Sequence, residues 1–209
     1  MAIQKKGHAI GKLGQTVSYL LNGELVTRTI GITDKKPTKP QLTFRQKTKI
    51  LNPFLKKVTE FINVGFELEG VKESKQPYAI AFGHNLVNAF KGTYPKMSID
   101  FEKVKLSSGS MPLVSEIKVE VVNEGFKFNW NPDSVELGMH WTDQVMLLAY
   151  FPKLKKAMYI TGGTNRDLGT CLLPLYTISR GHVAETYLSF ITNDHRNISN
   201  SIYTGQWLW

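Results

Sequence analysis

Histidine and cysteine, which most often serve as catalytic bases, nucleophiles and metal ligands, are few and scattered in this 209-residue chain. No histidine has a second histidine four residues away or a glutamate at the spacing of a zinc-protease motif, so no metal site is predicted. The strongest catalytic candidate is His140, beside Trp141 and close to Asp143, but an isolated histidine is more often structural or exposed. We therefore predict a protein that is not an enzyme and that needs no cofactor.

The single cysteine, Cys171, lies in an apolar stretch at residues 170–173. One thiol excludes an intramolecular disulfide framework and a metal site made of several thiolates. A reactive thiol needs an exposed, electropositive setting, which this stretch lacks. We expect Cys171 to be buried and inert.

The strongest candidate for an interaction site is a basic segment at residues 35–57. It has no acidic residue between Asp34 and Glu60. A helix with this charge could lie along a phosphate backbone or against an acidic protein surface. Its only aromatic residues are Phe44 and Phe54, so no platform for base stacking is visible. Its basic side chains are Lys35, Lys36, Lys39, Arg45, Lys47, Lys49, Lys56 and Lys57.

The positive charge lies in one half of the chain. Residues 1–99 carry 16 basic and 6 acidic side chains, whereas residues 100–209 carry 10 basic and 11 acidic ones. This asymmetry favours an acidic partner, although a solvated basic face is the more common explanation. The sequence has no apolar run long enough to span a membrane and no secretory signal, so a cytoplasmic protein is expected.

The elements that would position the basic segment are a hairpin and two or three helices. Asn22-Gly23 between two β-prone runs predicts a β-hairpin at residues 16–30. A helix is predicted from about residue 40 to residue 64, with a kink or a break at Pro53. Residues 68–76 are expected to form a loop, and residues 77–90 a further helix.

From about residue 99 the hydrophobic period changes to two, which predicts an all-β region. Turn signals every 8–12 residues favour an antiparallel β-sandwich of immunoglobulin or fibronectin type III style. The predicted fold is thus α+β, with a basic hairpin-and-helix region at 1–98 and a sandwich domain at 99–209. The expected strands are 101–106, 116–122, 126–130, 143–151, 155–161, 168–175, 184–192 and 201–208.

Both ends of the chain are candidates for contacts between subunits. Tyr203, Trp207 and Trp209 lie close to the C-terminus and offer a large apolar area. They either close the core of their own chain or insert into a neighbour. The arm at residues 1–14 has few apolar groups, and it either folds back or adds to the edge of a neighbouring sheet.

Several short motifs together are similar to a domain-of-unknown-function family of about 210 residues from Bacteroidota. The N-terminal part contributes Gly11, Gly14 and the stretch from Lys36 to Gln41, and the middle contributes Gly65-Phe66, Asn85 and Gly92-Thr93-Tyr94-Pro95. Two further motifs are Leu106-Ser107-Ser108-Gly109-Ser110 and Ile198-Ser199-Asn200-Ser201-Ile202-Tyr203. The most specific elements are Gly92-Thr93-Tyr94-Pro95 and the closing Ser199-Asn200-Ser201 with Tyr203. The resemblance implies a bacterial source, an α+β layout and a non-enzymatic role, and it transfers no catalytic residues.

Three functions remain open from the sequence, of which the third is an adaptor or effector that uses the sandwich as a recognition module. The first is a structural protein that self-associates, with a filamentous or phage-like assembly as one form, through sheet edges and terminal arms. In it the basic half of one copy would meet the neutral-to-acidic half of the next, and such a heterologous contact yields a ring or a filament. The alternative is a sequence-independent nucleic-acid-binding protein that uses residues 35–57.

Overall fold

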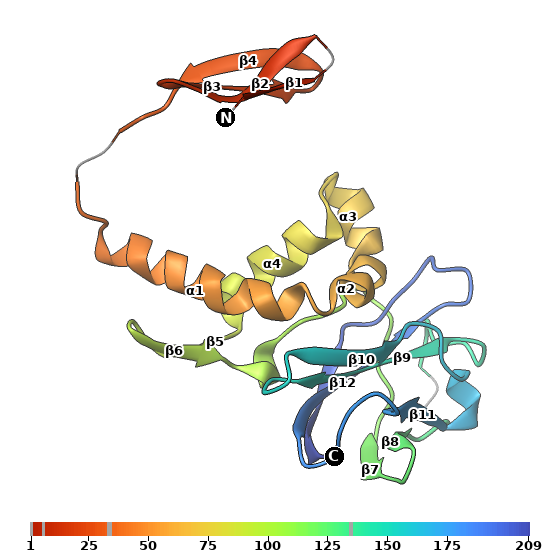
Figure 1. The fold of residues 1–209 in the computed structure, drawn as a ribbon. Helices are drawn as coiled ribbons and strands as arrows, with labels where there is room; N and C mark the ends of the chain where they lie inside the picture. Colours follow the sequence, from red (N-terminus) through yellow and green to blue (C-terminus); the bar gives the residue numbers. More distant parts are fainter. Residues whose placement is uncertain (1, 6, 33–34, 134–135) are drawn as a thin grey trace. The chain divides into compact units, whose positions relative to one another are not determined.

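The computed structural model describes residues 2–5, 7–32, 35–133 and 136–209 (Figure 1). The chain forms two compact units, Met1–Thr38 and Lys39–Trp209. The described residues include four α-helices and thirteen strands, and the strands form four antiparallel sheets. The predicted mixture of helices and antiparallel sheet is therefore confirmed. The division into regions 1–98 and 99–209 stays a prediction.

The first unit is a four-stranded antiparallel meander with the order β1-β2-β3-β4. The predicted hairpin is present as β3 and β4, and the positive φ values of Asn22 (52°) and Gly23 (90°) close its turn. Of the two alternatives for residues 1–14, the arm takes the first and folds back, since it supplies β1 and β2 of the same sheet. The strands are β1 (Ala2–Lys5), β2 (His8–Leu13), β3 (Thr16–Leu21) and β4 (Glu24–Thr29).

The second unit begins with four helices. Pro53 lies in the last turn of the first one, and the chain starts a new helix at Thr59, so the long helix predicted for 40–64 is split. The loop predicted at 68–76 is wrong, because most of it is helical and Leu68 packs on the core below. None of the described helices is long and apolar enough to cross a bilayer. They are α1 (Lys39–Leu55), α2 (Thr59–Gly65), α3 (Glu67–Glu73) and α4 (Pro77–Asn88).

A small hairpin, β5 (Phe90–Thr93) and β6 (Lys96–Ile99), follows α4. The strand predicted at 101–106 is wrong, since this stretch begins as a short 3-10 helix, Phe101–Lys103. Asn85 Nδ2 donates a hydrogen bond to the carbonyl of Lys105, and the backbone N–H of Lys105 donates one to Asn85 Oδ1, each at 2.8 Å. These two backbone groups therefore do not pair with a neighbouring strand.

The other seven predicted strands are confirmed and form two sheets. One sheet has the order β10-β9-β12-β13, and the other has the order β11-β8-β7. Figure 1 shows the helices on one side of the four-stranded sheet and β7, β8 and β11 on the other. The strands are β7 (Lys118–Val121), β8 (Gly125–Asn129), β9 (Gln144–Phe151), β10 (Lys156–Ile160), β11 (Thr170–Pro174), β12 (Val183–Ile191) and β13 (Ile202–Leu208).

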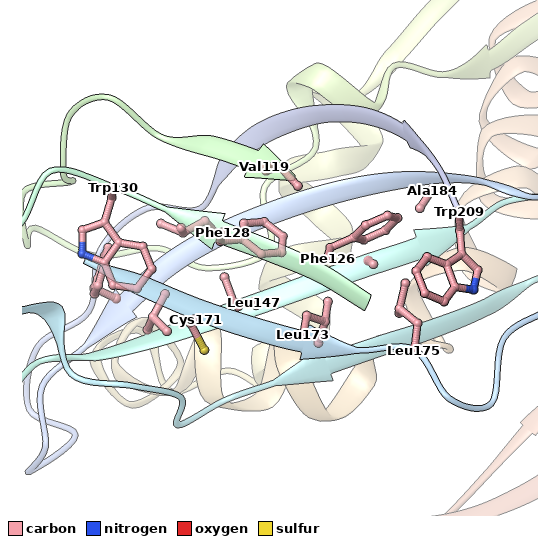
Figure 2. Close-up of a cluster of buried hydrophobic side chains, with 14 of the residues drawn as sticks. Val119, Phe126, Phe128, Trp130, Leu147, Cys171, Leu173, Leu175, Ala184 and Trp209 are labelled. Carbon is pink, nitrogen blue, oxygen red and sulfur yellow. The ribbon is translucent and has the colours of Figure 1, made fainter. Parts of the chain in front are cut away.

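Strand β9 is buried on both faces, which explains its nearly continuous apolar sequence. Leu147 and Phe151 belong to the core between the two sheets, whereas Leu148 and Tyr150 belong to the core under the helices. Figure 2 shows the first of these cores, with Phe126 and Phe128 of β8 among its members. Strand β9 thus contributes side chains to both cores. The helices, the four-stranded sheet and the three-stranded sheet form three layers of one unit.

Candidate functional site

The most unusual surface of the second unit is formed by α1, α4 and the β5–β6 hairpin, which contact one another. Residues 39–59 and 77–99, which build these elements, contain no Asp or Glu at all. We call this surface the basic face. Because no carboxylate of its own elements offsets the charge, it favours an anionic partner. Its basic residues are Lys39, Arg45, Lys47, Lys49, Lys56, Lys57, Lys91 and Lys96.

The structure separates the eight basic residues that are neighbours in the sequence. Lys39, Arg45 and Lys49 are exposed on α1. Lys56 and Lys57 are exposed in the turn after it. Lys35 and Lys36 belong to the first unit, in the connector that leads to α1.

Lys47 has a structural role. Its Nζ donates a hydrogen bond of 3.0 Å to the carbonyl of Leu86, near the C-terminal end of α4. The same atom lies 5.0 Å from the centre of the Phe90 ring. A cation at a helix C-terminus satisfies carbonyls that have no intrahelical partner. Lys47 therefore fastens α1 to α4.

Where α1 meets the hairpin, the basic face has a hollow of about 690 Å³, which we call the aromatic hollow. Gln46 Nε2 donates a hydrogen bond of 2.6 Å to the carbonyl of Pro95 and holds the hairpin to the helix. This contact brings Tyr94 beside Arg45 and Lys49. Nothing in the sequence around residues 35–57 points to Tyr94, because only tertiary packing brings it to the basic segment. The hollow is lined by Leu42, Arg45, Gln46, Lys49, Ile50, Tyr94 and Pro95.

On the other side of α1 lies a groove of about 530 Å³, which we call the apolar groove. Its most exposed apolar members are Phe44, which is 55% exposed, and Val87, which is 74% exposed. Contiguous exposed apolar patches are common places for partner binding. The groove is lined by Lys39, Pro40, Thr43, Phe44, Lys47, Leu86 and Val87.

Two motifs from distant parts of the sequence are joined by hydrogen bonds. Ser107 Oγ donates to the carbonyl of Ser199 at 2.8 Å, and Ser201 Oγ accepts from the backbone N–H of Leu106 at 2.8 Å. Ser199 Oγ accepts a third hydrogen bond, from the backbone N–H of Phe190 at 2.8 Å. We call this set the serine clasp, and it ties the segment before β7 to the start of β13.

A family model described as a family of unknown function, DUF6266, matches residues 2–205. The chain belongs to DUF6266. None of the curated proteins compared with it matches. The resemblance inferred from the motifs is thus confirmed as membership of a family of unknown function.

In this DUF6266 chain two of the motifs that carried the resemblance, at residues 106–110 and 198–203, form the serine clasp. Ser107 and Ser199 are fully buried, and their hydroxyls are used within the chain. Buried polar groups need such partners, since an unpaired one costs about 1–3 kcal/mol. The clasp therefore accounts for these residues by folding rather than by catalysis.

The catalytic candidate of the DUF6266 chain does not form a histidine–carboxylate pair. Asp143 Oδ2 accepts hydrogen bonds from the backbone N–H of His140 at 2.8 Å and from Arg166 Nε at 3.1 Å. The His140 ring is exposed, and its Nδ1 lies 2.6 Å from Thr142 Oγ1. Burial lowers the pKa of the Arg166 guanidinium, and the charge of Asp143 opposes that effect. Asp143 is thus the partner of a buried arginine.

The remaining candidates lie in cores. Cys171 is buried on β11, as predicted, and Figure 2 shows it among the apolar side chains between the sheets. Trp209 is buried in the same core, where its Nε1 donates to the carbonyl of Ile178 at 2.9 Å. From the sequence, the C-terminal tryptophans are expected either to close the core of their own chain or to insert into a neighbour. Trp209 closes the core of its own chain. Within the described residues, no group of three or more His, Cys, Asp or Glu could hold a metal ion.

Trp207 and Tyr203 are half-buried on β13. The hydroxyl of Tyr203 donates to Glu185 Oε2 at 2.6 Å, and Trp207 Nε1 donates to the carbonyl of Thr204 at 3.2 Å. Burial, followed by the hydrogen bond to Glu185, raises the pKa of Tyr203. Both polar ends are therefore engaged within the chain.

Proposed function

We propose that this protein is a non-enzymatic structural protein that self-associates through its N-terminal sheet. The observation that carries the proposal is that none of the side chains described in residues 3–32 is buried. A sheet with exposed apolar side chains needs a second layer to cover them. A second copy of the chain would supply that layer.

The N-terminal sheet carries apolar residues in one row. Ile3 lies opposite Ile10 on β1 and β2, and Tyr19 lies opposite Val26 on β3 and β4. Because Gly11 pairs with Ser18, the alternation of side chains puts these four residues on the same face. In addition, β1 and β4 are the edge strands of the sheet, and unpaired edges are places where a strand of another chain can add.

The test is the molar mass of the full chain by size-exclusion chromatography with light scattering. We expect the wild-type protein to exceed the 23.6 kDa of one chain, and a variant with Ile10→Ser and Tyr19→Ser to have a lower mass. A matched control is Ser18→Ala with Thr27→Ala, on the opposite face of the same strands. A wild-type monomer at every concentration, or a serine variant with the wild-type mass, would overturn the proposal.

We further propose that residues 118–208 form a sandwich of the immunoglobulin or fibronectin type III kind. The order of the strands supports this. Strands β9, β12 and β13, the third, sixth and seventh of the region, share one sheet with the fourth strand, β10. Strands β7, β8 and β11, the first, second and fifth, form the other sheet. In immunoglobulin-like folds the corresponding strands C, F and G share a sheet, with an added C′ strand in variable-type domains. Such modules are common in proteins that bind other proteins.

A second candidate function is sequence-independent binding of single-stranded nucleic acid at the basic face. The aromatic hollow favours it, because Tyr94 lines the same hollow as the cations Arg45 and Lys49. Cationic grooves that follow the backbone, combined with aromatic side chains on which bases stack, are typical of such binding.

This candidate predicts two separable effects on the binding of a short fluorescein-labelled single-stranded DNA. Arg45→Gln with Lys49→Gln should reduce the slope of log K against log salt by about 0.7 for each phosphate that the protein no longer neutralises. Tyr94→Ala should weaken binding by about 1–3 kcal/mol without changing that slope, because stacking involves no counterions. The change in fluorescence anisotropy reports both, with Lys153→Gln, in the β9–β10 turn, as the control. Absence of binding at low salt contradicts the candidate.

A further inference from the structure

Two exposed large apolar residues, Leu137 and Trp141, lie in the connection between β8 and β9. Leu137 is fully exposed, and Trp141 is 61% exposed. Asp133 and Glu136 are exposed beside them in the sequence. Residues 131–142 contain these two carboxylates and no Lys or Arg. We call the described residues 136–142 together with Asp133 the acidic loop.

The acidic loop and the apolar groove have complementary properties. The groove has exposed Phe44 and Val87 with the cation Lys39 at its rim, and its elements carry no carboxylate. The loop offers Leu137 and Trp141 with two carboxylates. Aromatic and aliphatic anchors that enter an apolar pocket supply most of the binding free energy at interfaces, and opposite charges at the rim set partner and register.

The loop of one chain does not fill its own groove. Both belong to the same compact unit, and Figure 1 shows the beginning of α1 far from the connection between β8 and β9. Two different patches that fit each other but cannot meet within one chain make a heterologous contact. Repeated from copy to copy, such a contact closes into a ring or continues as a filament.

We propose that the acidic loop of one copy docks into the apolar groove of a second copy. Leu137 and Trp141 pack on Phe44 and Val87, and Glu136 faces the Lys39 side of the groove. This inference rests on the proposed self-association and adds to it a second contact, separate from the N-terminal sheet. Because the loop and the groove are different patches, each docked pair leaves one free loop and one free groove, so this contact can extend the assembly beyond a dimer.

The experiment uses two full-length variants and their mixture. The groove variant carries Phe44→Ser and Val87→Glu, and the loop variant carries Leu137→Ser and Trp141→Ser. All four residues are exposed, so we expect both variants to keep the wild-type far-ultraviolet circular dichroism spectrum. By light scattering, each variant alone should have a molar mass at least about twofold below that of the wild-type assembly.

An equal mixture of the two variants should restore a larger mass, because the intact loop of one fits the intact groove of the other. Tyr176→Ser, which removes an equally exposed apolar residue outside both patches, should leave the mass unchanged. If both variants keep the wild-type mass, or if the mixture restores nothing, the proposed contact is wrong.

The outcome also separates this contact from the one at the N-terminal sheet. If the Ile10→Ser, Tyr19→Ser variant has a lower mass than the wild type and the groove and loop variants do not, self-association through the sheet is supported. The proposed contact between loop and groove is then wrong. If mixing the groove and loop variants restores a larger mass and the sheet variant has the wild-type mass, the contact between loop and groove is supported. Self-association through the N-terminal sheet is then wrong.

Discussion

Replacing Asp143 by alanine is expected to lower the free energy of unfolding by about 3–5 kcal/mol. The carboxylate of Asp143 and the guanidinium of Arg166 are both almost completely buried, and they form an ion pair of 3.1 Å. Without Asp143 the charge of Arg166 remains in the core, 4.0 Å from the Phe190 ring, with no carboxylate to offset it. Breaking a buried pair on one side is costly because the other ion stays desolvated.

The measurement is urea denaturation followed by tryptophan fluorescence. Lys75→Ala, which breaks the exposed pair of Lys75 with Glu73, is the control and should cost no more than about 1 kcal/mol. Asp143→Leu combined with Arg166→Met should cost less than the two single changes added together, since the double change leaves no unpaired charge. An Asp143→Ala protein as stable as the Lys75→Ala protein would mean that the pair is not buried as described.

Replacing Gly109 by alanine is expected to destabilise the chain by about 1–3 kcal/mol. A Cβ atom at Gly109 would lie 2.0 Å from the carbonyl oxygen of Ile198 and 2.5 Å from its Cγ2. The backbone of Ile198 cannot yield freely, because its carbonyl accepts a hydrogen bond from Met111 and the serine clasp follows at Ser199. Relief of this close approach therefore requires the clasp to shift.

The matched control is Gly83→Ala on α4. At that position an added Cβ meets nothing within 4 Å, and alanine is favoured over glycine in a helix interior. This variant should be more stable by about 0.8–1 kcal/mol. The two substitutions thus have opposite expected signs in the same urea titration. Equal effects of both would show that the close approach at Gly109 is unimportant.

Several features followed from neighbouring residues and could be predicted from the sequence. Asn22-Gly23 closes a turn because these two residues adopt positive φ at low cost. The apolar run of β9 marks a strand covered on both faces, and the burial of Cys171 follows from its apolar neighbours. Family membership was also visible in short motifs, before their role as the serine clasp was known.

Other features depend on which distant segments meet, and periodicity carries no such information. Residues 101–106 alternate like a strand, but Asn85 and Ser201 take their backbone hydrogen bonds. Asp143 lies beside His140 in the sequence, yet its ionic partner is Arg166, which is 23 residues away along the chain. Similarly, α3 forms where a polar stretch suggested a loop, because Leu68 finds an apolar core.

The same distinction applies to the candidate site. The basic character of the N-terminal half, and the large share of that charge in residues 35–57, follow from the amino-acid sequence alone. Folding decides that Lys47 holds α4, that Tyr94 joins Arg45 and Lys49, and that Trp209 fills its own core. The difference arises because charge and local conformation are properties of short segments, whereas burial, hydrogen-bond partners and a shared surface are set by contacts between segments far apart in the chain.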